Sequence, residues 1–136
     1  HTLEDLQTWL RRFYREVNLK HQESELTSYV TQLSEYFLGK RKRFDFPLHL
    51  LGTDFQKSVW RALSRIPYGQ VRSYKQIAEA IGKPKAVRAV GYANKCNPMA
   101  IVIPCHRVIG SDGKLVGYSS GLDKKRKLLQ IEGYLA

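Results

Sequence analysis

One cysteine of this chain stands where it could serve as a nucleophile. Cys105 follows the apolar stretch 101–103 and Pro104, which together predict a short strand and its end, and His106 comes directly after it. A buried cysteine is ordinarily a small, inert hydrophobic residue, and Cys96, the second cysteine, fits that description. Cys105 instead precedes polar residues and a Gly-Ser-Asp-Gly turn, so we expect a reactive thiol there.

A reactive thiol needs a base that takes its proton, and the base needs a group that orients it. Neighbouring residues do not face each other on a helix or a strand, so we expect His106 to reach the sulfur through a water molecule. Glu132, in the sequence LLQIEG, is the acidic residue with apolar neighbours, and it is the candidate for a buried orienting carboxylate. Such a relay predicts a thiol that ionises more readily than a free cysteine.

Other chemistries find less support in the sequence. The two cysteines and four histidines show no paired spacing of zinc ligands, so we expect neither a metal nor a cofactor. No apolar run approaches the roughly 20 residues that span a bilayer, and no secretion signal is present. We therefore expect reduced thiols and a cytoplasmic protein without a membrane contact.

The net charge of +11 is confined to one part of the chain. Residues 57–136 hold fifteen of the 23 Lys and Arg residues but only four of the 12 Asp and Glu residues. One-sided charge of this size indicates a polyanionic partner, nucleic acid first and a membrane surface second, although it could serve solubility alone. We place a domain boundary near residue 52, between an N-terminal subdomain (1–51) and a second domain (52–136).

Short helices fill the first half of residues 52–136. Thr53 is placed to cap a helix over 54–66, and Ser73 with Gln76 forms a capping box before a helix over 74–82. A second short helix is expected at 86–95. Two short helices joined at a glycine predict a helix-turn-helix, although helical hairpins that bind nothing look the same.

The helix expected at 86–95 lacks the row of long polar side chains that reads base edges in the major groove. Its only long basic side chain near the middle is that of Arg88. The small residues around it are Ala86, Val87, Ala89, Gly91 and Ala93. Small residues allow close approach to a sugar-phosphate wall, and one arginine can act as a wedge, which favours sequence-independent binding in the minor groove. The alanines could also face the core, on another side of the same helix.

Residues 1–51 are mainly helical in pattern. Apolar residues recur at helical spacing over 3–17 and over 23–39, where Gly39 is expected to end the helix. The sequence 44–50 alternates like a short strand, and its proline indicates a sheet edge. The basic run 40–43 is typical of a solvated loop after a helix, and a nucleic-acid patch is the alternative.

Three segments also carry a family resemblance: SYKQIAEAIGKPKAVRAVGYANKCNP, NPMAIVIPCHRVIGSDG and GYSSGLDKKRKLLQIEG. Over about residues 52–134 the chain resembles the O6-alkylguanine-DNA alkyltransferases, also called methylated-DNA–protein-cysteine methyltransferases. The resemblance implies an α+β protein with a short N-terminal subdomain and a mainly helical, winged-helix-like DNA-binding domain that carries the active-site cysteine. It also implies a monomer that flips O6-alkylguanine, chiefly O6-methylguanine, out of duplex DNA and moves the alkyl group irreversibly to that cysteine, once per molecule.

The resemblance assigns roles to individual residues. It implies that Cys105 is the acceptor, His106 the water-mediated base and Glu132 the carboxylate of the relay. Asn97 matches the asparagine that ties the recognition helix to the active-site turn. Arg88 matches the arginine that enters the duplex in place of the guanine.

Further matches concern the base pocket and the DNA surface. Tyr74 matches the tyrosine that crowds the phosphate of the flipped nucleotide and can donate to the purine. The walls and polar contacts of the base pocket correspond to the carbonyl of Val108 and to Tyr118 and Ser119. The other DNA-binding residues implied are Ala86, Val87, Ala89, Gly91 and Lys95.

This sequence departs from the family pattern at several positions. The N-terminal domain of the family is longer and rich in strands, so residues 1–51 are expected to be an abbreviated or truncated version. Ser120 stands where many relatives have glycine, at the rim of the pocket, and this bears on the tolerance for bulky alkyl groups. Tyr92 and Cys96 replace smaller or basic residues, and Cys96 is expected to take no part in the alkyl transfer.

Two other functions compete with alkyl transfer. Some relatives keep the helices and the pocket but replace the cysteine, and they act as non-enzymatic sensors of alkylated DNA; Cys105 is present here. A transcriptional regulator would need a polar recognition helix, and it would leave the Cys-His-Arg sequence unexplained.

Overall fold

The computed structural model describes residues 23–45, 50–116, 118 and 121–135. The chain divides into two compact units, His1–Leu48 and His49–Ala136, and each is described by itself. The helix predicted at 3–17 and most of the strand predicted at 44–50 lie outside the described residues. Among the helices that are described, none is long and apolar enough to cross a membrane.

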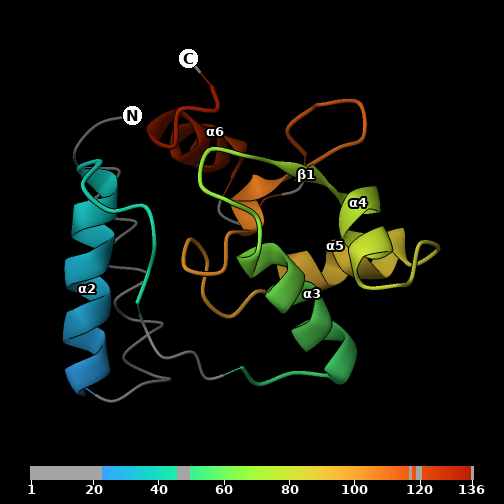
Figure 1. Ribbon diagram of the computed structural model, residues 1–136, viewed down its shortest axis with the longest axis horizontal. Coiled ribbons are helices and arrows are strands. Elements are labelled where there is room, and N and C mark those ends of the chain that lie inside the picture. The colour runs from blue at the N-terminus through green and yellow to red at the C-terminus, as the bar shows by residue number, and fades with distance from the viewer. Residues whose placement is uncertain (1–22, 46–49, 117, 119–120, 136) are drawn as a thin grey trace. The chain divides into compact units, whose positions relative to one another are not determined.

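The first unit contributes helix α2 (Glu23–Phe37), drawn in blue in Figure 1. This helix confirms the prediction for 23–39. Gly39, just beyond its end, has a φ of 74°, in the left-handed region that glycine adopts freely. The Gln32 side chain exchanges two hydrogen bonds with the backbone of Asp45, at 2.6 and 2.8 Å. These bonds hold the segment after α2 against the helix.

The second unit is an α+β domain in which helices predominate, as predicted (Figure 1). Its elements in chain order are α3 (Asp54–Ser64), β1 (Arg72–Ser73), α4 (Tyr74–Ala80), α5 (Val87–Lys95), the 3₁₀ helix η1 (Cys105–Arg107), β2 (Val108–Ile109) and α6 (Leu122–Ile131). Strands β1 and β2 pair in parallel, with Arg72 opposite Val108. This short pairing brings the start of α4 beside the segment that holds Cys105.

The capping box predicted at Ser73 is present, and the predicted cap at Thr53 is also part of a capping box. Thr53 and Gln56 exchange two hydrogen bonds between side chain and backbone, each of 3.1 Å. Ser73 and Gln76 do the same at 3.1 and 2.8 Å. Each box satisfies two backbone N–H groups that a helix start would otherwise leave without a partner. Helix α4 therefore begins where β1 ends, which fixes Tyr74 as its first residue.

A compact apolar core joins the helices of the second unit. Large buried side chains of this core are Val59, Leu63, Ile77, Val90, Leu128 and Leu129. Trp60 is also buried, and its indole N–H donates to the carbonyl of Ala93 at 2.9 Å. Because this bond satisfies the only polar group of the indole, α3 is tied firmly to α5. The inner side of α5 is thus fixed by the core, and its outer side faces solvent.

The short strand predicted at 101–103 is wrong. This segment forms a turn with a single bridge between Ala100 and Ile103, and Ile101 has a φ of 76°. Asn97 decides the local conformation: its side chain donates to the carbonyl of Ile103 at 2.7 Å and accepts from the N–H of Met99 at 2.9 Å. A β-branched residue is strained at positive φ, so these bonds and burial of the side chain hold Ile101 there.

Candidate active site

Cys105 opens the 3₁₀ helix η1, and only 5% of its surface is exposed. Burial raises the pKa of its thiol, while the side chains of Asn97, Lys125 and Tyr118 lower it. The net direction is upward, unlike the expectation from the sequence, because burial keeps water from the charged sulfur. The resting residue is therefore a protonated thiol whose polar neighbours favour its ionised form.

His106 and Glu132 meet in the interior of the second unit. The Nε2 atom of His106 lies 2.6 Å from Oε2 of Glu132, and both side chains are fully buried. Burial lowers the pKa of His106, although Glu132 opposes this effect. A neutral imidazole that donates from Nε2 to a carboxylate carries its lone pair on Nδ1. That nitrogen has no hydrogen-bond partner among the described residues, so its lone pair is available to accept a proton.

Arg107 is a partner of Glu132 that the sequence analysis did not assign. Its Nε and Nη2 donate to the two carboxylate oxygens at 2.8 and 2.9 Å, and Nη1 donates to the carbonyl of Ile66 at 2.7 Å. The guanidinium also lies 5.7 Å from the centre of the Tyr68 ring. Burial alone would raise the pKa of Glu132, but hydrogen bonds from His106 and Arg107 lower it to about 2. Glu132 is therefore an anion at neutral pH, held by the side chains of His106 and Arg107.

The turn 67–70 closes over the end of α6, where Glu132 caps the helix. Tyr68 donates its hydroxyl to the carbonyl of Ile131 at 3.1 Å, and the N–H of Gly69 points at the Glu132 carboxylate at 3.4 Å. Gly69 has a φ of 80°, and a Cβ there would lie 3.2 Å from the backbone oxygen of Glu132. This close approach requires glycine. The turn 67–70 is therefore one of the elements that hold Glu132 in place.

Lys125 is a second residue that the sequence analysis did not assign. Its side chain is fully buried, and its ammonium group donates to the carbonyls of Val108 and Val116. Burial lowers its pKa to about 8, while the nearby Cys105 opposes that shift. A signal existed: Lys125 occupies the same helical face as the buried Leu128 and Leu129, three and four residues on. Because Lys125 stands among other basic residues, the sequence analysis did not single it out.

Tyr74 also lies near the thiol. Its hydroxyl donates to the carbonyl of Val116 at 3.2 Å. Burial and the neighbouring Cys105 raise the pKa of Tyr74, so the phenol keeps its proton at neutral pH. A protonated phenol beside a nucleophile can donate a proton to a leaving group.

The other residues expected at the base pocket are placed only in part. Val108 is fully buried, and its carbonyl already accepts from Lys125. Tyr118 is half-buried and interacts with the thiol of Cys105. Ser119 and the departure at Ser120 lie outside the described residues.

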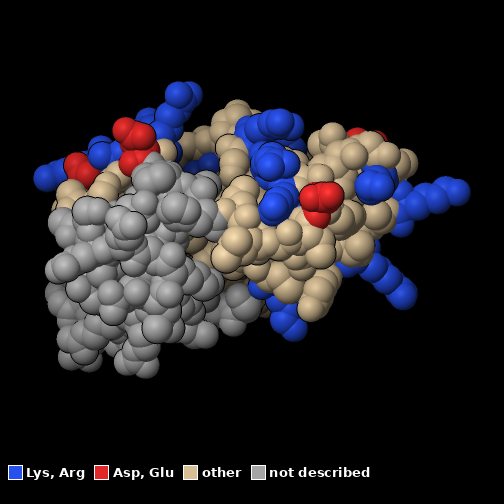
Figure 2. Space-filling model, turned by 90° about the horizontal axis from the view of Figure 1, so that it is seen from below, with Lys and Arg blue, Asp and Glu red and all other residues tan. Residues whose placement is uncertain are grey.

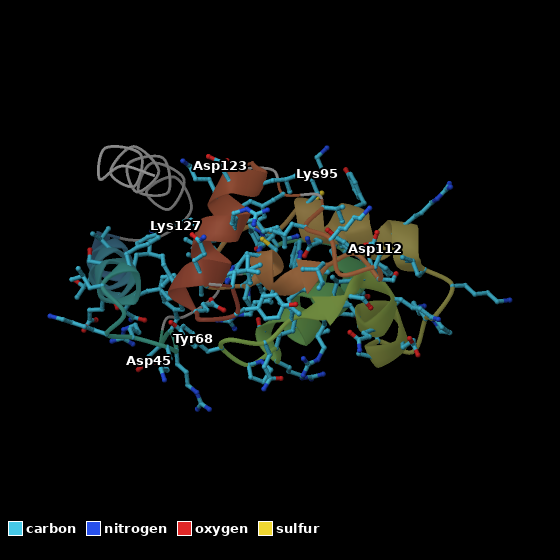
Figure 3. All side chains as sticks on the ribbon, turned by 90° about the horizontal axis from the view of Figure 1, so that it is seen from above. Asp45, Tyr68, Lys95, Asp112, Asp123 and Lys127 are labelled. Atoms are coloured by element: carbon cyan, nitrogen blue, oxygen red, sulfur yellow. The ribbon has the colours of Figure 1, made fainter. Side chains whose placement is uncertain are left out.

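Helix α5 turns one side to the core and the other to solvent. Its buried residues are Val90, Ala93 and Asn94. The residues expected to bind DNA lie elsewhere on the helix: Val87, Arg88, Ala89 and Lys95 are exposed, Gly91 is half-buried, and Ala86 precedes the first turn. Lys95 projects at the end of α5, on the opposite side of the second unit from Tyr68 (Figure 3). The exposed side of α5 is thus separate from the buried relay.

The surface of the second unit is basic. The sequence has no acidic residue between Glu79 and Asp112, a stretch that includes all of α5. Lys and Arg side chains project from the face shown in Figure 2, where acidic side chains are sparse. Within the described residues, no group of three or more His, Cys, Asp or Glu side chains could hold a metal ion.

Comparison with known proteins settles the family. A family model described as 6-O-methylguanine DNA methyltransferase, DNA binding domain, matches residues 54–134. The chain belongs to this family. A second model, described as the ribonuclease-like domain of the same methyltransferase, matches residues 4–50.

Individual relatives agree with the family models. A methylated-DNA–protein-cysteine methyltransferase of Methanosarcina barkeri is 66% identical over 101 residues, which are 74% of this chain and 64% of that protein. The crystal structure of Mycobacterium tuberculosis OGT in complex with DNA is 56% identical with a TM-score of 0.77, over 79% of this chain and 66% of that one. S. pombe Atl1 in complex with damaged DNA containing O6-carboxymethylguanine is 37% identical with a TM-score of 0.54, over 62% of this chain and 80% of that one. The chain thus spans less than two thirds of the length of the Methanosarcina relative.

The Glu132 ion pair makes a prediction about acid stability. A carboxyl whose pKa is lowered on folding stabilises the protein above its ordinary pKa, and this contribution is lost as the pH falls through the folded value. For Glu132, with a pKa of about 2, the loss between about pH 5 and pH 2 amounts to up to about 3 kcal/mol. The Glu132→Gln variant should lack this component of the pH dependence.

The free energy of urea unfolding, followed by tryptophan fluorescence across that pH range, measures the effect. Asp112→Asn removes an exposed acid and is the matched control, which should keep the wild-type slope. A Gln variant with the wild-type slope would show that the buried carboxylate does not carry it.

A second prediction concerns Lys125. The Lys125 cation lowers the pKa of the Cys105 thiol, so Lys125→Met should raise the pH at which Cys105 reacts half-maximally. The measurement is the rate of iodoacetamide labelling of Cys105 against pH, resolved from that of Cys96 by peptide mass. Lys127→Met, on the same helix, is the control that should leave the profile in place. An unshifted profile for Lys125→Met would remove this residue from the site.

Proposed function

We propose that this protein is a methylated-DNA–protein-cysteine methyltransferase, which moves an alkyl group from O6 of guanine to its own Cys105. The observation that carries the proposal is the buried Cys105 thiol followed by His106, whose imidazole meets Glu132 at 2.6 Å. Membership of the family supports it independently. The proposed catalytic residues all lie within the second unit of one chain, and action as a monomer is part of the proposal.

The residues of the site account for each proton in the transfer. The thiol of Cys105 gives its proton to Nδ1 of His106 through a water molecule, and the sulfur attacks the alkyl carbon. A carbon–sulfur bond forms as the carbon–oxygen bond to guanine breaks, and Tyr74 donates a proton to the departing base. The imidazolium of His106 then returns a proton to the phenolate of Tyr74, so that the net change is a thioether and an unmodified guanine.

Electrostatics favours this sequence of steps. Glu132 holds His106 with its Nε2–H inward and stabilises the imidazolium that forms. Arg107 keeps Glu132 ionised throughout, and Lys125 supplies a buried positive charge near the developing thiolate. A thioether has no easy route back to a thiol among the groups of this site, which supports a single turnover for each molecule.

DNA is proposed to bind along the exposed side of α5, through the minor groove and without sequence preference. Small residues on that side permit close approach, while Arg88 can fill the space that a flipped guanine leaves. Flipping costs a few kcal/mol, and the arginine recovers part of that cost by replacing the lost stacking. Contacts to the backbone predict an affinity that falls steeply with salt.

The transfer is tested with a duplex oligonucleotide that contains one O6-methylguanine. Intact-protein mass spectrometry should show one added methyl group per molecule, located on Cys105 by peptide mapping, and no further reaction with excess substrate. Cys105→Ser should bind the duplex but accept no methyl group, because a serine hydroxyl is a far weaker nucleophile at neutral pH.

Cys96→Ser is the matched control and should react like the wild type. Repeated turnover, or a methyl group on Cys96, would refute the proposed mechanism. Binding of the modified duplex without any transfer would indicate a lesion sensor instead.

The role of Arg88 is tested by comparing two substrates. Arg88→Ala should slow reaction with the duplex about tenfold or more, and should slow reaction with free O6-benzylguanine far less, because the free base needs no flipping. Arg61→Ala, which removes an exposed cation from α3, is the control and should affect both rates little. Equal losses on both substrates would place Arg88 in the chemistry rather than in base extrusion.

A further inference from the structure

Tyr92 is an unusual residue on the exposed side of α5. Its side chain is 64% exposed, although the rest of this side consists of small residues and cations. Successive residues of a helix are rotated by about 100°, so Tyr92 lies only about 40° around the helix from Arg88 and one turn further along. Lys95 lies on the same stripe. The stripe faces away from the buried Val90 and Ala93.

Packing within the protein does not explain this aromatic ring. An exposed large side chain by itself is ordinary, so the argument rests on where this one stands. It lies between two cations, Arg88 and Lys95, on a helix without acidic residues. Interaction with the Cys96 side chain raises the pKa of the Tyr92 hydroxyl, so the phenol is neutral and can donate a hydrogen bond.

We propose that Tyr92 is a further DNA-contact residue, which extends the binding surface of α5 one helical turn beyond Arg88. Its ring packs on the sugar-phosphate wall of the groove, and its hydroxyl donates to a phosphate oxygen. This inference rests on the proposed function, because duplex DNA along α5 is its premise.

The dimensions of both helices fit the proposal. One turn of α5 advances about 5.4 Å, and each nucleotide of a strand advances about 3.4 Å along the duplex axis. With α5 lying along the groove, Tyr92 reaches one to two nucleotides beyond the position that Arg88 fills. Lys95 then meets the backbone of the same region as a point charge, whereas Tyr92 contributes apolar contact and a neutral donor.

This difference in charge gives the contact a distinctive signature. A cation that neutralises a phosphate releases a counterion, so its removal makes affinity less dependent on salt. A neutral tyrosine releases none. Tyr92→Ala should therefore weaken binding by the same factor at every salt concentration, whereas Lys95→Ala should reduce the slope of log affinity against log salt by about one.

The experiment measures fluorescence anisotropy of a labelled, undamaged duplex titrated with each variant at four salt concentrations. Tyr92→Ala should raise the dissociation constant roughly fivefold to tenfold, the size of one lost packing contact and hydrogen bond. Tyr92→Phe keeps the ring and should lose about twofold to threefold, the share of the hydroxyl. Tyr134→Ala removes an exposed tyrosine from the C-terminal end of the chain and should bind like the wild type.

The outcomes separate this inference from its premise. Unchanged affinity of Tyr92→Ala, or tighter binding because the ring obstructs the groove, would overturn the role of Tyr92 while the wild type still binds DNA. A salt slope changed by Tyr92→Ala would also overturn it. A wild type without affinity for the duplex would refute the proposed function itself. Reaction rates with methylated duplex and with free O6-benzylguanine complete the test, and Tyr92→Ala should lose several-fold more on the duplex.

Discussion

The second unit is organised around one buried anion, the carboxylate of Glu132. Its two oxygens accept from His106 and from the fork of Arg107, and all three side chains lie in the interior. A charge without partners would be prohibitively costly there, so the surrounding backbone must hold both donors in place. The ion pair therefore fixes η1 against the end of α6, and the thiol that precedes His106 takes its position from that contact.

The same constraint separates the proposed chemistry from the proposed recognition of DNA. Glu132 and its partners are held by the core, by the turn 67–70 and by the carbonyl of Ile66, which accepts from Arg107. Helix α5 is attached to the core of the second unit through the indole of Trp60 and through its own buried side. Its outer side is therefore not needed for packing. That side combines cations, small residues and one tyrosine, which is a composition suited to a polyanion. The buried relay and the exposed side of α5 thus occupy different parts of one small domain.

Local sequence patterns predicted much of this arrangement. The cap at Thr53, the capping box at Ser73, the helix end at Gly39 and the nucleophile candidate at Cys105 all follow from short-range rules that depend on adjacent residues. The strand predicted at 101–103 failed, because Asn97 binds the backbone there and imposes a turn that β-branched residues would not choose. The side-chain contacts of Asn97 therefore outweighed the local preference of these residues for a strand.

The sequence by itself determined the helices α2 to α5, the charge of residues 57–136 and the residue types able to do chemistry, because these depend on composition and spacing. Tertiary structure alone decided which groups meet. Arg107 could have pointed to solvent, and Lys125 stands in a run of cations of which only this one is fully buried among the described residues. The direction of the pKa of Cys105 was also beyond the sequence, because it depends on the balance of burial against polar neighbours, which arises only when segments distant in the chain pack together.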